Sequence, residues 1–242
     1  MTIPAATATS AAAVFGDRLD LAERFAGWLT GAGITRGLLG PREADQVWER
    51  HLLNGVGIGS LIGVGSVVLD LGSGAGLPGI PLLLARPDLR MVLVEPKVRR
   101  VEFLAEVCAD LELSARVLRA RATPDGLMLV PEGTIGDHVR PADVVTARAV
   151  APIADLARWA APLLRVGGRL LAVKGASAAG ELQRDRSVLD GLGYAEATVL
   201  TVCAAAGSAG SAGSTGIEPP QSATATVIAM TWKGGVSRET RS

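Results

Sequence analysis

The chain has 242 residues, and its 24 basic and 24 acidic side chains give a formal net charge of zero. Hydrophobic residues make up 48% of the sequence, enough to bury a core, which excludes an intrinsically disordered protein. Zero net charge argues against a polybasic protein, although a local basic face would suffice for an RNA contact. The two cysteines, Cys108 and Cys203, form neither a disulfide framework nor a metal site, which predicts a reduced cytoplasmic chain without a metal.

The first sixty residues divide into a tail and a small helical cap. Residues 1–14 are rich in Ala and Thr and have no basic stretch before an apolar one, so we expect a disordered tail rather than a signal peptide. Residues 15–60 form the cap, with helical spacing over Asp17–Thr30 and a second helix over Pro41–Leu53. The uncharged run Leu52–Leu69 contains several glycines, which makes a membrane span improbable.

From residue 61 to 232 short apolar runs alternate with helical patterns. The predicted strands are Val67–Leu69, Arg90–Glu95, Ala115–Leu118, Asp143–Thr146 and Arg169–Val173, and the predicted helices are Pro78–Ala85, Lys97–Leu113, Ile153–Leu164 and Glu181–Leu192. This alternation is typical of an α/β domain with a parallel sheet covered on both faces. We expect Thr198–Cys203 and Thr224–Trp232 to pair antiparallel at the sheet edge, joined by a flexible Gly/Ser-rich loop at 204–223, and residues 233–242 to be a disordered tail.

The segment Val67–Gly79 runs from a strand through glycines into a helix, an arrangement that favours a ligand with polar or anionic groups. Two cofactors compete for it. Gly74-x-Gly76-x-x-Gly79, followed by Glu95, matches a dinucleotide fingerprint. Asp70, however, would repel a pyrophosphate and suits the cationic amino-acid end of S-adenosylmethionine. We therefore favour S-adenosylmethionine, held by the loop residues Asp70, Gly72, Gly74 and Gly76 and by Glu95.

Past this loop the sequence offers no nucleophile system, because His51 and His138 lie near no Ser or Cys signature. Methyl transfer to an unprotonated ring nitrogen needs alignment and a fixed charge field rather than a base. The sequence is therefore compatible with methylation of a purine N7 and poorly compatible with hydrolysis.

Four stretches resemble the 16S rRNA guanine-N7 methyltransferases, also called glucose-inhibited division protein B. They are Leu69-Asp-Leu-Gly-Ser-Gly-Ala-Gly-Leu-Pro-Gly-Ile-Pro81, Trp48-Glu-Arg-His-Leu-Leu-Asn54, Thr146-Ala-Arg-Ala149 and Leu170-Leu-Ala-Val-Lys-Gly175. The Leu-Pro-Gly-Ile-Pro continuation is far more specific than the glycines alone. The similarity extends over residues 15–201 in order and spacing, and the composition suggests an actinobacterial source.

The resemblance implies a class I S-adenosylmethionine-dependent methyltransferase, Rossmann-like, with a seven-stranded, mostly parallel sheet and a small N-terminal helical part. It implies methylation of N7 of guanine 527 in 16S rRNA of the 30S subunit by direct in-line transfer without a general base, with S-adenosylhomocysteine as product, by a cytoplasmic monomer. Arg148 is the expected catalytic residue, through orientation and charge. The cofactor-binding residues are expected to be Asp70, Gly72, Ser73, Gly74, Gly76, Leu77, Glu95, Ala122, Thr123 and Arg148, and the RNA-binding residues Arg50, His51, Lys174 and Arg121. Thr123 departs from the family, which often has an acidic residue at this position.

Alternatives stay open from the residues alone. The same fold and loop would serve a methyltransferase for a small molecule or a protein, a nicotinamide oxidoreductase, or a non-catalytic ribosome-binding factor. His51 could equally be a packed interior histidine, and Lys174 a surface lysine. Arg119 and Arg121 could contact RNA or pair with nearby acids, and Trp159 has the spacing of a core residue.

Overall fold

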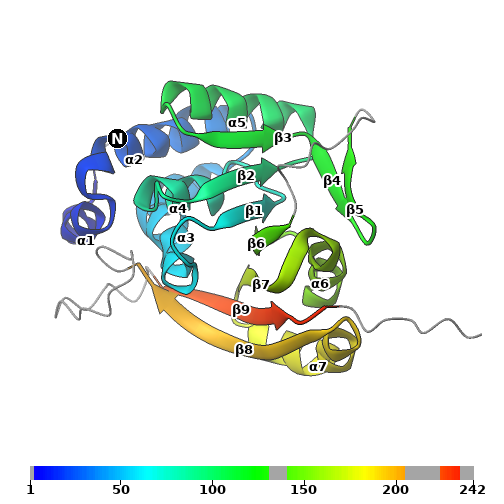
Figure 1. The fold of residues 1–242 in the computed structure, drawn as a ribbon. Coiled ribbons are helices and arrows are strands. Elements are labelled where there is room, and N and C mark those ends of the chain that lie inside the picture. The colour runs from blue at the N-terminus through cyan, green and yellow to red at the C-terminus, as the bar shows by residue number, and fades with distance from the viewer. Residues whose placement is uncertain (1–2, 131–140, 205–223, 235–242) are drawn as a thin grey trace, which may run out of the picture.

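The computed structural model describes residues 3–130, 141–204 and 224–234, which contain a seven-stranded sheet in the order β3-β2-β1-β6-β7-β9-β8 (Figure 1). Its strands are β1 Val67–Leu71, β2 Arg90–Val94, β3 Ala115–Leu118, β6 Ala142–Arg148, β7 Leu164–Lys174, β8 Tyr194–Cys203 and β9 Thr224–Trp232. The strands from β3 to β7 in this order are parallel, and β9 runs antiparallel to β7 and β8. The strand order reverses between β1 and β6, so a crevice opens beyond their carboxyl ends.

Helices cover both faces of the sheet (Figure 1). They are α1 Ala5–Phe15, α2 Leu19–Trp28, α3 Asn54–Val56, α4 Gly79–Ala85, α5 Val98–Asp110, α6 Ile153–Ala160 and α7 Ala178–Gly191. The 3-10 helices are Gly16–Arg18, Pro41–Gln46, Gly57–Leu61 and Ala161–Leu163, and the π-helical turns are Leu29–Gly33 and Val47–Leu53.

Alternate residues of each strand point to opposite faces, and two core clusters result. Val68 of β1 packs in the cluster that includes residues of α1, α2, α4 and α5, whereas Leu69 packs in the cluster that includes residues of α6 and α7. Both faces are therefore buried, as the continuous apolar strands predict. The α/β fold with a seven-stranded, mostly parallel sheet is confirmed.

The C-terminal hairpin is also confirmed: β8 pairs antiparallel with β9 from Tyr194 opposite Trp232 to Cys203 opposite Thr224. β8 lies at the sheet edge and β9 lies between β7 and β8. Residues 205–223 of the predicted Gly/Ser-rich loop and residues 235–242 of the predicted tail lie outside the described residues.

The expectation of a disordered tail over residues 1–14 is wrong for most of that segment. Ala5–Phe15 is helix α1, and its Ala11, Val14 and Phe15 are buried. Thr7 is also buried and donates a hydrogen bond to Glu49 at 3.2 Å. The alanines favour a helix, and contacts with the segment around Trp48 bury it.

The structure adds a two-stranded antiparallel hairpin that the sequence did not predict, β4 Ala120–Thr123 and β5 Gly126–Leu129. It follows β3 and brings Ala120 and Ala122 toward the crevice. Within the described part of the chain, no helix combines the length and apolar character that crossing a bilayer would require.

Candidate active site

The loop that begins at Gly72, directly after β1, turns sharply at its glycines. Gly72 has φ +69° and Gly74 has φ +59°, conformations that favour glycine. The N–H groups of Gly72 and Ser73 donate to the carbonyl of Val94 in β2, at 2.8 and 3.1 Å. A Cβ at Gly72 would lie 2.7 Å from Cγ2 of Val150, so the space beside this glycine is closed to any side chain.

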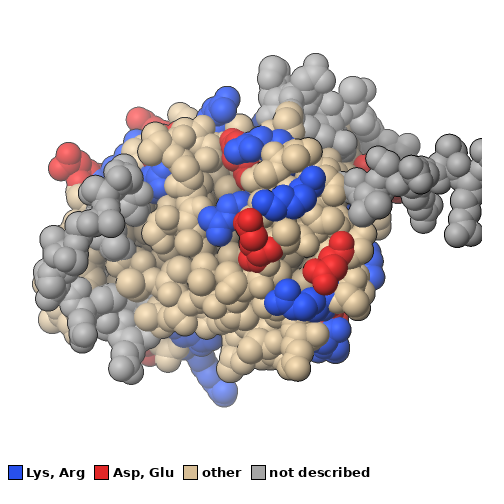
Figure 2. Space-filling model, turned by 60° about the horizontal axis from the view of Figure 1, so that its bottom comes forward, with Lys and Arg blue, Asp and Glu red and all other residues tan. Residues whose placement is uncertain are grey.

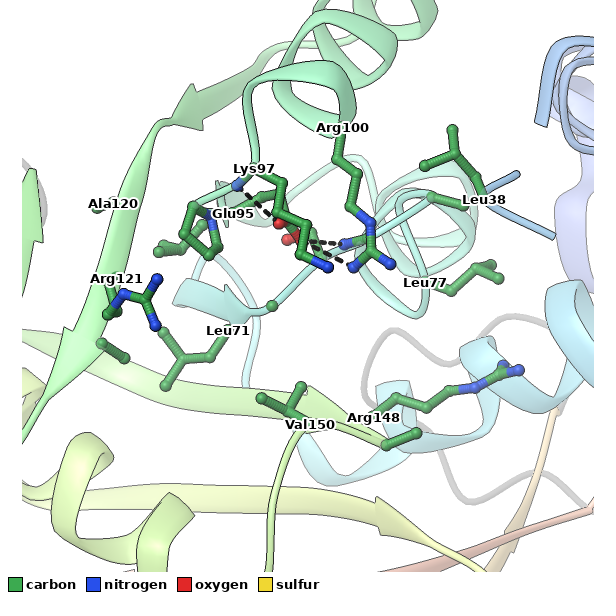
Figure 3. A pocket seen from close by; sticks show the side chains of 18 of the residues that line it. Leu38, Leu71, Leu77, Glu95, Lys97, Arg100, Ala120, Arg121, Arg148 and Val150 are labelled. Carbon is green, nitrogen blue, oxygen red and sulfur yellow. Dashed lines mark hydrogen bonds and ion pairs between the residues drawn. The ribbon is translucent and has the colours of Figure 1, made fainter. Parts of the chain in front are cut away.

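Glu95, directly after β2, holds the loop in place (Figure 3). Its buried carboxylate accepts hydrogen bonds from the N–H of Gly74 at 3.1 Å and from the N–H of Lys97 at 2.9 Å. The Arg100 guanidinium lies 3.5 Å away. One carboxylate therefore connects the glycine loop to the start of α5 while still lining the cavity.

Asp70 lies beneath the loop and is completely buried. Its Oδ2 accepts a hydrogen bond from the N–H of Gly79 at 3.3 Å, and its Oδ1 is buried without a partner among the described residues. Burial raises the pKa of Asp70 to about 7, against the lowering effect of the nearby Ser73 hydroxyl and of the hydrogen bond from Gly79. The prediction that Asp70 touches the cofactor is therefore not supported: it supports the loop from below and does not line the cavity.

Arg148, at the end of β6, is anchored to the helical cap. One guanidinium nitrogen donates to the carbonyl of Arg50 at 3.1 Å, and the other contacts Nδ1 of His51. Burial is the largest cause that lowers the pKa of His51 to about 4, and Arg148 lowers it further against the opposing effect of Glu43. The imidazole is therefore neutral at pH 7, and its Nδ1 is free to accept the hydrogen bond of Arg148.

These elements surround a cavity of about 520 Å³ beyond the ends of β1, β2 and β6, which we call the main cavity (Figure 3). It includes nine of the predicted residues: His51, Gly72, Ser73, Gly74, Leu77, Glu95, Arg121, Ala122 and Arg148. Its volume is within the usual range for a small-molecule site.

Besides Asp70 and Lys174, three predicted positions lie outside the main cavity, for identifiable reasons. Gly76 is structural, because a Cβ there would lie 2.4 Å from Cδ1 of Ile80. The Thr123 hydroxyl donates to the carbonyl of Gly126 at 3.0 Å, so this side chain is engaged within the hairpin turn and does not line the main cavity. Arg50 is exposed, and its guanidinium bonds to Gln46 at 3.3 Å.

Lys174 is likewise not placed for RNA. Its ammonium donates to the carbonyl of Ala151 at 2.7 Å and to Glu181 at 2.9 Å, and only 11% of its side chain is exposed. The strand-end position of Lys174 suggested a phosphate contact, but helix α7 supplies the counter-charge. We do not retain it as an RNA-binding residue.

Sequence reasoning missed several residues of the main cavity: Leu38, Leu39, Glu43, Lys97, Arg100, Val150 and Trp159. Lys97 and Arg100 follow Glu95 at the start of a predicted helix, and that position was a usable signal. Trp159 has core spacing along its helix, yet it is half-buried and faces the main cavity. Leu38 and Leu39 follow a loop with no periodic pattern, so nothing marked them.

The geometry separates the two candidate cofactors. A dinucleotide would need free N–H groups at the start of α4. The N–H of Gly79 donates to Asp70, and that of Ile80 donates to the carbonyl of Gly76. Among the described residues no group of three His, Cys, Asp or Glu side chains is placed to hold a metal ion. The site therefore fits a cofactor that contacts the loop Gly72–Gly74 and Glu95 rather than the start of α4.

Comparisons with known proteins agree with this geometry. The family model of rRNA small subunit methyltransferase G, GidB, matches residues 18–206. Proteins named ribosomal RNA small subunit methyltransferase G are similar over most of the chain. The one from Mycobacterium marinum is 49% identical over 191 residues, covering 79% of this chain and 80% of that protein. The one from Salinispora arenicola is 53% identical over 194 residues, covering 79% and 78%.

Among solved structures, the similarity is more distant. A precorrin-6y C5,15-methyltransferase from Geobacter metallireducens has a TM-score of 0.47 at 17% identity, covering 81% of this chain and 90% of that one. With the family model matching most of the chain and relatives about half identical to it, this protein belongs to the rRNA small subunit methyltransferase G family.

Proposed function

We propose that this protein transfers the methyl group of S-adenosylmethionine to N7 of guanine 527 in 16S rRNA of the 30S subunit. One observation carries the proposal: the main cavity joins a cofactor-type loop to Arg148, and each carboxylate or imidazole in its lining already accepts a hydrogen bond within the protein. Glu95 accepts two backbone N–H groups, Glu43 accepts the N–H of Gly40 at 3.1 Å, and His51 accepts from Arg148. A site without a free base suits an acceptor that carries no proton.

The residues fit S-adenosylmethionine. Gly72, Ser73 and Leu77 would line its methionine end, Glu95 has lone pairs left for ribose hydroxyls, and Ala122 lies on the adenine side. Asp70, whose pKa burial raises to about 7, is partly ionised at neutral pH, and its ionised form would favour a cationic ligand above the loop. When bound, the cofactor supplies an electrophilic methyl group on a sulfonium.

The chain's own residues then have to align and dehydrate the acceptor. N7 of guanine has a free lone pair, so bond formation to the methyl carbon releases no proton and requires no general base. Arg148 is held by Arg50 and His51 at the mouth of the main cavity, where its guanidinium can orient the guanosine or its phosphate. Because the substrate is rRNA within a ribosomal particle, we also propose that the protein acts in the cytoplasm. We further propose that it acts as a monomer.

The test is methyl transfer from labelled cofactor to 30S subunits that lack N7 methylation, with naked 16S rRNA and a protein mixture as parallel acceptors. Borohydride and aniline cleavage maps N7-methylguanine. We expect one cleavage, at guanine 527, which Arg148→Ala abolishes. Arg158→Ala is the matched control, because this arginine pairs with Asp155 on α6 at 2.9 Å. Label in protein, or no label in RNA despite cofactor binding, would contradict the proposal.

A further inference from the structure

A second cavity, of about 420 Å³, adjoins the main cavity and shares Leu38, Pro96, Lys97 and Arg100 with it. We call it the basic cavity, because five of its lining residues are basic and none is acidic: Arg36, Lys97, Arg99, Arg100 and Arg119. It lies between the turn after Leu29–Gly33 and the start of α5. Any ligand in it would lie beside a ligand in the main cavity.

Only part of this positive charge is neutralised within the protein. Arg36 forms a two-pronged ion pair with Glu106, at 2.7 and 3.0 Å, and Arg100 lies 3.5 Å from Glu95. Lys97, Arg99 and Arg119 have no carboxylate within ion-pair distance in the described part of the chain. The guanidinium of Arg99 instead donates to the carbonyl of Arg36 at 2.9 Å.

Arg119 gives an independent indication of a missing partner. Its Nε is buried and has no acceptor among the described residues. A buried N–H without an acceptor has lost its hydrogen bonds to water without replacement, which costs free energy, so native proteins rarely leave one unsatisfied. An acceptor that enters the basic cavity would remove this cost.

The start of α5 adds to the same field. The amino end of a helix is positive and favours anions. The first turn of this thirteen-residue helix contains no acidic residue and has no side-chain cap, and it contains Arg99 and Arg100 next to Lys97. The Glu95 carboxylate lies at this end and offsets part of the positive charge, and the remainder favours a further anion.

We propose that the basic cavity binds a backbone phosphate of the RNA substrate next to the nucleotide that enters the main cavity. The inference rests on the proposed function and names the residues that position its substrate. Guanidinium groups match phosphate oxygens in two-pronged geometry, so Arg99 and Arg119 are the expected contacts. Phosphate contacts of this kind fix the position of the nucleic acid and do not read its sequence.

Helix α7 contacts β8 and β9, at the other end of the sheet from β3, and provides a control surface. On the face shown in Figure 2, Lys and Arg side chains lie beside Asp and Glu. On α7, Arg184 pairs with Asp185 at 3.0 Å, and Arg186 donates to the carbonyl of Ala197 at 3.1 Å. Both are exposed, so removing them deletes two positive charges away from the basic cavity.

The experiment compares the pair Arg99→Ala/Arg119→Ala with the control pair Arg184→Ala/Arg186→Ala on unmethylated 30S subunits. We expect the first pair to raise KM at least tenfold and to keep kcat and the Kd for S-adenosylmethionine within twofold of wild type. The control pair should leave all three unchanged. For a contact to single-stranded RNA, the slope of log affinity against log salt should decrease by roughly 0.7, because the first pair loses its contact with one phosphate.

Three results would overturn the inference. The first is an equal KM for the two alanine pairs. The second is a loss of S-adenosylmethionine affinity in the first pair as large as its rise in KM, which would show a structural role. The third is binding of inorganic phosphate that the first pair loses while RNA affinity is unchanged, which would identify a free-anion site. The pair Arg99→Lys/Arg119→Lys guards against misfolding, since it keeps the charge and should recover most of the affinity. If wild type methylates no RNA, the proposed function itself has failed, and that result is separate from these.

Discussion

Replacing Gly72 with alanine should weaken cofactor binding more than the same replacement at Gly74. Both glycines have positive φ, +69° and +59°, so both alanine variants carry the left-handed backbone cost of about 1–2 kcal/mol. They differ in the space around the new methyl group. At Gly72 it would lie 2.7 Å from Cγ2 and 3.2 Å from Cγ1 of Val150, whereas at Gly74 the nearest atom is 3.7 Å away.

The side chain of Val150 is β-branched and has few alternative rotamers, so the new methyl group pushes against this residue and the wall it belongs to. Overpacking of this kind costs about 1–3 kcal/mol, which comes in addition to the backbone cost. Because Val150 also lines the main cavity, the shift changes the shape of the cofactor site as well as the stability. We expect at least tenfold weaker cofactor binding for Gly72→Ala than for Gly74→Ala, since 1.4 kcal/mol corresponds to a factor of ten.

A double-mutant cycle isolates the steric part. Val150→Ala removes both methyl carbons that the new Cβ meets, so the double variant Gly72→Ala/Val150→Ala should regain about 1–2 kcal/mol relative to additivity. Titration calorimetry with S-adenosylmethionine gives the affinities, and urea unfolding gives the stabilities. The reasoning is refuted if Gly72→Ala and Gly74→Ala bind equally well, or if Val150→Ala gives no coupling.

Three further predictions concern buried polar groups and are measured by urea unfolding. Burial raises the pKa of Asp70 to about 7, so the native state holds its proton above the unfolded pKa of 3.8 and stability falls as pH rises through this window. The free energy of unfolding of Asp70→Asn, relative to that of wild type, should therefore increase by roughly 2–3 kcal/mol between pH 5 and pH 7. A difference that stays constant over this range would contradict the buried-acid reasoning. The pKa of His51 is lowered to about 4, so the unfolded chain binds a proton at a higher pH than the native state does, and stability falls as pH drops from 6.5 toward 4. His51→Gln should lack this part of the stability loss in acid. A pH profile of stability identical to that of wild type would count against it. Tyr194→Phe should cost about 1–2 kcal/mol at every pH up to 9, because the hydroxyl donates at 3.0 Å to a buried carbonyl that would lose its partner; a neutral effect would mean that the carbonyl finds another donor.

The strands were predictable because each parallel strand is buried on both faces and reads as a short apolar run. The sequence Val67-Val-Leu-Asp is such a run, and the structure extends it to Leu71 with partners on both sides. The helix α1 was not predictable in the same way, since its Ala and Thr residues give no clear apolar stripe. Its burial depends on a contact with Trp48 that lies 33 residues beyond Phe15 in the chain, with ring centroids 6.4 Å apart.

The site residues could be predicted where local sequence constrains the backbone. They were harder to predict where a side chain pairs with a residue of another element. The positive φ angles of Gly72 and Gly74 and the strand-end position of Glu95 follow from local sequence, and all three residues line the main cavity. Which cations stay free does not follow from local sequence. Lys174 pairs with Glu181 across two elements, whereas Arg119 has no counter-charge in the described chain.

Zero net charge and an RNA substrate are compatible because pairing, rather than total charge, decides where an anion can bind. On the outer surface arginines commonly lie against a carboxylate, as Arg165 does with Asp143 at 2.6 Å and Arg24 does with Asp110 at 2.9 Å. Such pairs contribute little attraction to a distant phosphate, because their opposite charges largely cancel and salt screens the remaining field beyond a Debye length of about 8 Å. The unpaired cations of the basic cavity keep their field, and they adjoin the main cavity. A neutral protein built in this way would bind RNA weakly in general and firmly only where the phosphate and the guanine reach their two cavities together.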